Sequence, residues 1–421
     1  MTGTRLDITE ELDALLGGDP ERLARSFDIY AEMREQGRTY EHGPTVFVTR
    51  YEDVVAATKD ADTLGNRLTT GTRFVEARAR LSDEELEIHD EVQHVFDAFA
   101  SRHDGPSHIA IRRAAHRAFT ARRIAALETA TEAYTTELLD AVEQEGGVVD
   151  LMEFAYRLPL RVIGDLLGVR EEDREAVHEW SVLIGGAIGA TDMPSLRRAR
   201  DGIRGLRGFI DGLLQEHRAA PDAPSTDLVG LLLEADETGR MGEWELTGMY
   251  LQLLFAGHET TTNLIGIGMA ELLSAPQQWR ALVAQPEAVP AAIEELLRFV
   301  SPTQFMGRVA LRDCDIAGRP IRQGQSVMLA FAAANRDPRR WEDPDVLRID
   351  REDARDHISF GRGPHFCLGS SLARLEARIA ITQLARRFGD LEPVDEPRRW
   401  SGGAMLRHLD HLRVDLGRSP A

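Results

Sequence analysis

The sequence predicts a mostly α-helical protein with a small β component, and three observations support this fold class. Apolar residues recur at steps of three and four through several long segments, the period of a helix with one buried face. Strand-like stretches are few and lie early and late in the chain. The composition, 43% hydrophobic and 29% charged, is ordinary for a globular protein. The clearest helical segments are Ala125–Val142, Ala176–Leu183, Ile203–Leu214 and Pro290–Val300.

The β component is predicted from three short stretches. The first is Thr45–Thr49, which reads TVFVT. The second is the segment Arg308–Phe331, where Gly318 and Gly324 separate short apolar runs as the turns of small hairpins. The third lies at His411–Leu416. We therefore expect small sheets at both ends of a helical chain.

The overall counts exclude several functions. The net charge of −20 argues against a general nucleic-acid binder and against docking on an anionic membrane. The only cysteines, Cys314 and Cys367, cannot supply a disulfide framework or four thiolates for an iron–sulfur cluster. The N-terminus shows no basic segment followed by an apolar one, so we expect no signal peptide and a cytoplasmic location.

The domain organisation is predicted to be simple. The Pro-rich loop over residues 219–226 is too short to link independent domains. We expect one domain over residues 1–421, in which the first 27 residues pack loosely.

The apolar stretch Gly248–Leu273 has the length of a membrane span. Its centre, however, reads His258-Glu259-Thr260-Thr261. Ionisable groups in the middle of a lipid-facing helix are costly, so a helix buried in the protein is the better interpretation. Buried polar groups persist when they are paired or functional, which makes this centre a candidate site.

The strongest local signal is the segment Phe360–Gly369, FGRGPHFCLG, where glycines and a proline surround one cysteine before a helix-like run. Glycines let the backbone approach a large flat group, and the start of a helix favours a thiolate at Cys367. A thiolate as the only protein ligand to iron is the arrangement of a heme–thiolate centre. A buried structural cysteine and a nucleophilic pair of Cys367 with His365 are the alternatives.

This segment resembles the cysteine loop of the cytochrome P450 superfamily, whose pattern is Phe-Gly-x-Gly-x-His-x-Cys-x-Gly. The matching residues are Phe360, Gly361, Gly363, His365, Cys367 and Gly369. The resemblance extends over about residues 28–416 and is closest to soluble bacterial members. It implies a triangular-prism helical domain that encloses heme b, with Cys367 as the iron ligand and Phe360, Gly361, His365 and Gly369 against the cofactor.

The segment Ala256–Thr261 resembles the oxygen-activating helix of the same family. The resemblance implies that Ala256 and Gly257 let the helix pass over the flat cofactor. It also implies that Glu259 and Thr260 deliver protons to dioxygen, since a carboxylate and a hydroxyl form a proton relay in a dry pocket. The alternative for Thr260 is a hydrogen bond to a carbonyl of its own helix.

Glu295 and Arg298 match the Glu-x-x-Arg motif of the family and share one helix face. The resemblance implies a buried structural pair that supports the cysteine loop, whereas the alternative is a surface ion pair of little energetic value. A third arginine often joins the pair from a later segment, but here residues 344–347 read Pro-Asp-Val-Leu. We expect Arg336 to take its place.

Cations are expected at the heme propionates. His108 and Arg112 share a helical face, and the resemblance implies that they bind these carboxylates together with Arg308 and His365.

The chain contains no flavin or iron–sulfur domain, so the resemblance implies electrons from a separate ferredoxin and its reductase. Residues 112–123 carry five arginines in an acidic chain. We expect Arg113 and Arg117 to dock the acidic ferredoxin, although an ordinary solvated helix is the alternative.

Substrate contacts are predicted from the same resemblance at Gln304, Met306, Ala404 and Met405. This mostly apolar lining suits a mid-sized natural product or its precursor. Gln304 either orients the substrate or bonds to backbone.

The resemblance therefore implies a heme–thiolate monooxygenase. We expect a monomer that uses O2 to hydroxylate or epoxidise a small organic molecule of secondary metabolism. Oxidative coupling, ring formation and peroxide-driven oxidation are the alternatives within the same family. A heme-binding sensor without turnover is an alternative from another class, but it gives no reason for the acid–alcohol pair.

Overall fold

Helices form most of the computed structural model, which describes residues 8–116, 119–187, 192–219, 230 and 243–416. The mostly α-helical prediction is confirmed, and each predicted helical segment lies within a helix. The Pro-rich loop is outside the described residues from position 220 onward. The helices are α1 Ile8–Leu16, α2 Pro20–Ala24, α3 Ser26–Gln36, α4 Tyr51–Lys59, α5 Thr72–Arg78, α6 Asp83–Asp97, α7 Gly105–His116, α8 Ala121–Glu145, α9 Leu151–Leu167, α10 Arg174–Gly185, α11 Met193–Ala219, α13 Glu243–Ser274, α14 Pro276–Ala284, α15 Val289–Val300, α16 Phe331–Asn335 and α17 Ser370–Arg387.

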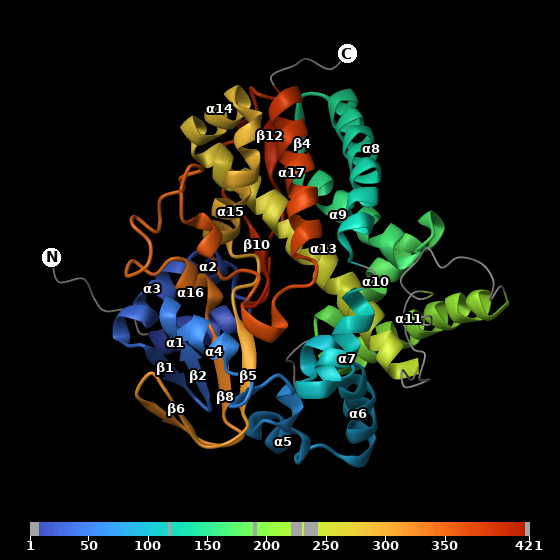
Figure 1. The fold of residues 1–421 in the computed structure, drawn as a ribbon, viewed down its shortest axis with the longest axis vertical. Coiled ribbons are helices and arrows are strands. Elements are labelled where there is room, and N and C mark those ends of the chain that lie inside the picture. Colours follow the sequence, from blue (N-terminus) through green and yellow to red (C-terminus); the bar gives the residue numbers. More distant parts are fainter. Residues whose placement is uncertain (1–7, 117–118, 188–191, 220–229, 231–242, 417–421) are drawn as a thin grey trace.

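The long helix α13 runs through the middle of the molecule (Figure 1). It packs against α9, α15 and α17, and its residues Leu264, Ile265 and Leu272 are fully buried in the main core. The apolar stretch is therefore a buried helix, as predicted. Within the described ranges, no helix is long and apolar enough to cross a membrane.

A five-stranded sheet lies beside α1–α4, away from the helical part of the molecule (Figure 1). Its strand order is β1-β2-β8-β5-β3, and β2 pairs with β8 in parallel, with Thr45 opposite Ser326. The predicted glycine turns are present, since Gly318 and Gly324 both have positive φ angles. The strands of this part are β1 Thr39–His42, β2 Thr45–Val48, β3 Leu64–Gly65, β5 Met306–Ala310, β6 Cys314–Ile316, β7 Arg319–Ile321 and β8 Ser326–Leu329.

Short strands late in the chain form two further sheets. The strand predicted near the C-terminus is β12, and it pairs with β4 so that Val414 lies opposite Val149. The others were not predicted, because strands of two or three residues are too short to show alternation. These unpredicted strands are β4 Val148–Asp150, β9 Glu392–Pro393, β10 Trp400–Gly402 and β11 Arg407–Leu409, whereas the predicted strand β12 spans Arg413–Asp415.

The start of the chain packs more tightly than expected. Ile8, Leu12, Leu15 and Leu23 are at most 3% exposed and belong to the main hydrophobic core. The expectation of a loosely packed segment is therefore wrong for residues 8–27, whose apolar residues recur at helical spacing in α1 and α2.

Candidate functional site

The cysteine loop closes on itself before α17 begins. The Cys367 amide donates to the Phe360 carbonyl at 2.9 Å. Gly361 and Gly363 have φ angles of 67° and 72°, which favour glycine. A Cβ on Gly363 would also lie 3.1 Å from a backbone oxygen of α4, whereas one on Gly369 would meet nothing within 4 Å. The loop thus holds Cys367 immediately before the N-terminus of α17.

The Cys367 thiol experiences opposing influences. Burial raises its pKa, while the backbone amides of Gly369 and Ser370 and the charges of Arg112 and Arg374 act to lower it. The net direction is upward. A cation bound at the sulfur favours the thiolate strongly, so this position suits a metal ligand.

Two of the predicted cationic residues meet at the cysteine loop. The rings of His108 on α7 and His365 in the loop are stacked, with centroids 3.9 Å apart. Burial lowers the pKa of His108 to about 4. Arg112, one turn further along α7, donates from Nη2 to the Phe366 carbonyl at 2.6 Å. His365 also lies 3.4 Å from an Asp104 carboxylate oxygen. Helix α7 is therefore fastened to the loop that carries Cys367.

Arg308, on β5, is a buried cation that forms no ion pair with any carboxylate of the described residues, although the charge of Asp104 acts on it from further away. It is 5% exposed, and its Nη1 donates to the Gly307 carbonyl at 2.8 Å. Burial lowers its pKa to about 10, and no carboxylate of the described residues lies within 4 Å of it. An uncompensated buried charge is costly, so an anionic group is expected beside it. The propionates of heme b fit this requirement.

Helix α13 presents only part of its predicted cofactor face. Ala256 is exposed, and Thr260 donates its hydroxyl to the Ala256 carbonyl at 2.6 Å, which is the alternative considered for this threonine. Gly257 is placed differently from the expectation. A Cβ there would lie 2.8 Å from Ile163 on α9, so its small size serves the contact between α13 and α9.

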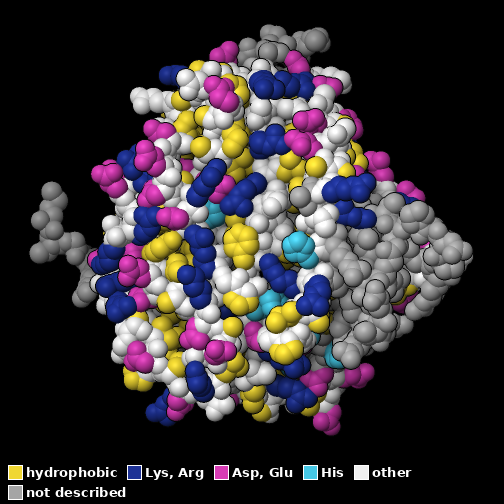
Figure 2. Space-filling model, viewed as in Figure 1, with side chains coloured by type: hydrophobic (Ala, Val, Ile, Leu, Met, Phe, Trp, Pro, Cys, Tyr) yellow, Lys and Arg dark blue, Asp and Glu magenta, His cyan; other side chains and the backbone are white. Residues whose placement is uncertain are grey.

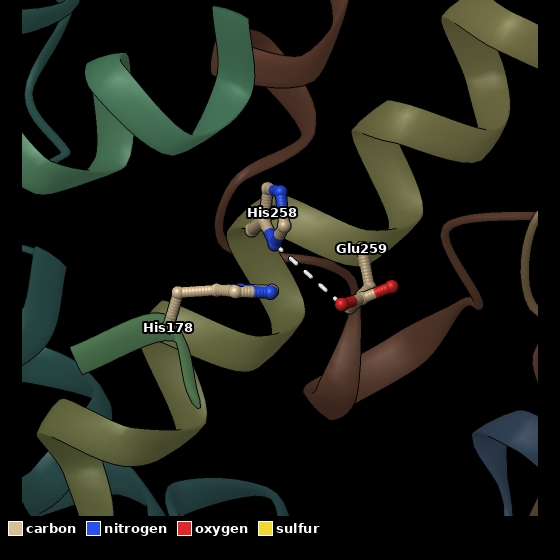
Figure 3. Close-up of side chains that lie close together, drawn as sticks. All are labelled: His178, His258 and Glu259. Carbon is tan, nitrogen blue, oxygen red and sulfur yellow. Dashed lines mark ion pairs between the residues drawn. The ribbon is translucent and has the colours of Figure 1, made fainter. Parts of the chain in front are cut away.

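The Glu259 carboxylate lies between two imidazoles. Its Oε1 is 3.6 Å from Nδ1 of His258, and its Oε2 is 3.6 Å from Nε2 of His408 on β11 (Figure 3 shows the first pair). Burial raises the pKa of Glu259, which favours the protonated acid. The side chain is thus suited to hold a proton, and sequence reasoning did not identify the role of His408 because it is distant in the chain.

His258 itself points away from the exposed face of α13. Its Nε2 lies 3.2 Å from the Tyr156 carbonyl of α9, and the ring is 2% exposed. Burial lowers the pKa of His258 to about 3. His178, on α10, completes an edge-to-face cluster with the Tyr156 and His258 rings.

Comparison with known proteins decides the family. A sequence model described as Cytochrome P450 matches residues 191–406. The polyketide biosynthesis cytochrome P450 PksS of Bacillus subtilis is 35% identical over 391 residues, which cover 92% of each chain. The chain belongs to the cytochrome P450 family.

Further relatives agree with this assignment. The 6-deoxyerythronolide B hydroxylase of Saccharopolyspora erythraea is 37% identical over 78% of this P450 and 80% of its own length. The crystal structure of P450BioI in complex with a hexadec-9Z-enoic acid ligated acyl carrier protein has a TM-score of 0.84 and 33% identity, covering 94% of this chain and 99% of that chain. This P450 is accordingly an oxidoreductase of the monooxygenase class, with heme b as cofactor and O2 and an organic molecule as substrates.

The Glu295–Arg298 pair of this P450 is fully buried. Arg298 donates to both carboxylate oxygens at 2.7 and 2.8 Å. The third partner is Arg351, whose Nε lies 3.0 and 3.1 Å from the same oxygens. The expectation that Arg336 fills this place is wrong. The guanidinium of Arg336 instead stacks between the rings of Phe27 and Phe299.

This network reaches the cysteine loop through Asn335. Arg298 donates to the Asn335 carbonyl at 2.8 Å, and the Asn335 side chain accepts from the Ile358 amide at 2.8 Å. Asn335 also donates to the Ser359 hydroxyl, which precedes Phe360. The buried pair therefore positions the start of the loop through two hydrogen bonds.

A second ion cluster, missed by sequence reasoning, joins α15 to α17. Glu294 accepts from Arg374 at 2.7 and 2.9 Å and lies 3.3 Å from His357. Burial raises the pKa of Glu294, but the hydrogen bonds from Arg374 and His357 outweigh burial and lower it to about 2. The Arg374 guanidinium also lies over the Phe360 ring, so this cluster links α15 and α17 to the first residue of the loop.

We predict that Glu294→Gln destabilises the protein in a pH-dependent way. A carboxyl with a depressed folded-state pKa stabilises the protein above its unfolded pKa, near 4.3, and loses that contribution as the pH falls through its folded pKa. The difference in unfolding free energy between wild type and variant should therefore be constant near neutrality and shrink from about pH 5 to 2. Urea unfolding over this range measures it. The exposed Glu10→Gln should show no such trend, and a difference independent of pH would contradict the prediction.

The predicted substrate residues are partly brought together. The backbone amide of Gln304 donates to the Met405 carbonyl at 2.9 Å. The side chains of Met306 and Met405 are half-buried. Gln304 is 1% exposed, and its side-chain nitrogen donates to the Val300 and Ser301 carbonyls. The backbone-bonding alternative therefore describes Gln304, while Ala404 is buried at 6% exposure.

Proposed function

We propose that Cys367 would bind the iron of heme b as a thiolate and that this P450 inserts oxygen into an aliphatic compound of secondary metabolism. The observation that carries this proposal is the glycine-shaped loop that holds Cys367 just before the N-terminus of α17 and is joined to α7 through Arg112 and the stacked rings of His108 and His365. The family assignment supports it, and the relatives described above are named for polyketide biosynthesis and for hydroxylation of 6-deoxyerythronolide B.

The protein's own residues bind and orient the cofactor. When bound, heme b supplies the activation of O2 and the oxidation of the substrate. Arg308 and His108, both buried, would bind the propionates, and Arg112 holds the loop against α7. Ala256 leaves the surface of α13 open toward the cofactor.

Glu259 is proposed as the proton donor of the site, with Thr260 next to it on α13. Burial raises the pKa of Glu259, so the carboxyl holds a proton more readily than an exposed glutamate. His408 is 29% exposed in its side chain and lies 3.6 Å from the carboxyl, so it can return protons from solvent. The Asn263 side-chain oxygen lies 3.2 Å from His408 Nδ1 and fixes the ring.

The substrate class is tested with a panel of macrolactones, fatty acids and aromatic compounds. A compound that enters the pocket and displaces the iron-bound water shifts the absorption of ferric heme. Medium-sized macrolactones and long-chain acyl compounds should give the largest shifts. When O2 and electrons are supplied, the same compounds should be converted to products that contain one more oxygen atom. Shifts only with small aromatic compounds, or products of coupling without added oxygen, would contradict the proposal.

We predict that Arg308→Leu weakens heme binding without destabilising the protein that lacks heme. The leucine removes a buried cation that forms no ion pair with a carboxylate of the described residues, but it also removes a charged hydrogen-bond donor of about 1.5–3 kcal/mol. The affinity of the variant for heme should be about 10- to 100-fold weaker than that of wild type. Transfer of heme from each protein to an excess of apomyoglobin measures this affinity. Arg322→Leu, at an exposed turn, is the control. Equal heme retention in both variants would show that Arg308 does not bind the propionates.

The electron donor is proposed to dock where α7 meets the cysteine loop. A hollow of about 500 Å³ opens here, lined by α7, Thr120 and Pro364. Figure 2 shows Lys and Arg side chains gathered in the middle of this face. Arg113 is exposed beside the hollow, whereas Arg117 lies outside the described residues. A positive surface near the cysteine suits an acidic ferredoxin.

We predict that Arg113→Glu slows electron transfer from an acidic plant-type ferredoxin. Reversing one charge at the docking surface should lower the rate about tenfold at low salt and less at high salt, because screening weakens the attraction that it removes. Stopped-flow reduction of the heme measures the rate. Arg280→Glu on α14 serves as the control, and equal rates for the two variants would place the docking surface elsewhere.

A further inference from the structure

A cluster of two histidines and one glutamate lies between α10 and α13. His178, His258 and Glu259 each place one nitrogen or oxygen atom within 4.8 Å of the others. Figure 3 shows the three side chains pointing toward one another. We propose that this cluster binds a divalent transition-metal ion, of which Zn²⁺ is the best match, separate from the heme iron.

The ligand atoms are available for a metal. The Nε2 of His258 faces the Tyr156 carbonyl, so its proton is used there and the lone pair of Nδ1 faces Glu259. The Nδ1 of His178 is buried and has no hydrogen-bond partner among the described residues. Two imidazoles and one carboxylate are a common zinc ligand set, in which the fourth position stays open to water.

The surrounding groups hold these ligands in place. The Tyr156 carbonyl fixes the ring of His258, an arrangement that is typical of metal-binding histidines. The second Glu259 oxygen faces His408, which is itself held by Asn263. The Tyr156 ring packs edge-to-face against both His178 and His258, at interplanar angles of 83° and 76°. The site therefore has neighbouring groups that fix the orientation of its ligand side chains.

The spacing is close to what zinc requires. Tetrahedral ligands about 2.1 Å from zinc are about 3.4 Å from one another. The distance from Glu259 to His258 is 3.6 Å, so this pair is nearly in place. The ligand atoms of all three residues lie within 4.8 Å of one another, so His178 would have to move only a short distance to become the third ligand. Glu259 keeps 17% of its side chain exposed, which gives an ion a way in.

A bound ion would hold the Glu259 carboxylate on the α10 side of α13. The acid could then neither carry a proton nor approach Thr260, so Zn²⁺ would inhibit turnover. This consequence rests on the proposed function of Glu259, whereas binding of the ion does not.

The test is zinc binding by the purified holoenzyme with any affinity tag removed. Equilibrium dialysis against Zn²⁺ at concentrations set by a chromophoric chelator should show one tight zinc per heme. His178→Phe retains a ring against Tyr156 and removes one ligand, and Glu259→Gln removes another. Each should weaken binding at least tenfold. The exposed His411→Gln is the matched control and should bind zinc like wild type, and excess Mg²⁺ should not compete.

The carbon-monoxide spectrum of each reduced variant establishes that its heme site is intact before zinc is measured. If His178→Phe loses heme, the zinc affinities of Glu259→Gln and His411→Gln are compared instead, and this comparison tests whether zinc binds at the cluster. Absence of tight zinc in wild type, or zinc binding unchanged in an intact His178→Phe or Glu259→Gln, would overturn the metal site. Zinc that binds at this cluster without slowing oxidation of the compound selected above would leave the site standing and count against the proposed role of Glu259.

Discussion

Cys367→Ser is expected to abolish oxygenation and to remove the red-shifted absorption band of the reduced, carbon-monoxide-bound protein. In the proposed site, Cys367 would be the only protein residue bound to the iron, and its thiolate would donate the electron density that suits heme to oxygenation chemistry. A serine hydroxyl of nearly the same size fits the loop, because the Cys367 amide still donates to the Phe360 carbonyl. The effect should therefore fall on chemistry and heme ligation more than on folding.

The other cysteine provides the control for this experiment. Cys314 lies in β6, paired with Ile321 on β7, and is remote in the chain from the loop. Cys314→Ser should retain the spectrum, the heme content and the product yield of wild type. Oxygenation that persists in Cys367→Ser would show that the iron is bound by another residue.

Glu295→Ala is expected to cause the largest loss of stability. The carboxylate is fully buried and compensates both Arg298 and Arg351, so its removal leaves two buried cations without a counter-ion. Breaking a buried ion pair by removing one partner costs about 3–5 kcal/mol. The same change should loosen the cysteine loop through Asn335, and heme should be lost early in thermal unfolding.

An exposed pair offers a matched comparison. Glu35 pairs with Arg339 at 3.1 Å, but both side chains are about half exposed. Glu35→Ala should therefore cost less than about 1 kcal/mol. Urea unfolding monitored at the heme absorption and by circular dichroism measures both variants. A loss for Glu295→Ala no larger than that for Glu35→Ala would contradict the buried network.

The sequence was sufficient where the signal is local. The periodicity of Pro290–Val300 predicted α15, and the polar centre of Gly248–Leu273 predicted a buried helix instead of a membrane span. The pattern around Cys367 identified the loop because glycine, proline and cysteine act on their immediate neighbours.

Local signals fail when a role depends on residues that meet only in the fold. Arg351 reaches Glu295 from a loop 56 residues further along the chain, and no local pattern in the sequence distinguished it from Arg336, which was expected in its place. His408 approaches Glu259 from a two-stranded sheet too short to be predicted. From the sequence alone, the small size of Gly257 was interpreted as space for a cofactor. In the fold, the close contact with helix α9 requires a small residue at this position.

The parallel pairing of β2 with β8 constrains how the chain is made. Strand β2 ends at Val48 and its partner ends at Leu329, so β2 leaves the ribosome long before β8 exists. At 5–20 residues per second, the interval is roughly 15–55 s. During synthesis the β1–β2 hairpin has an unpaired edge, which is a place for aggregation or for a chaperone to bind. Faster translation or a longer-lived chaperone contact should therefore change the yield of folded enzyme.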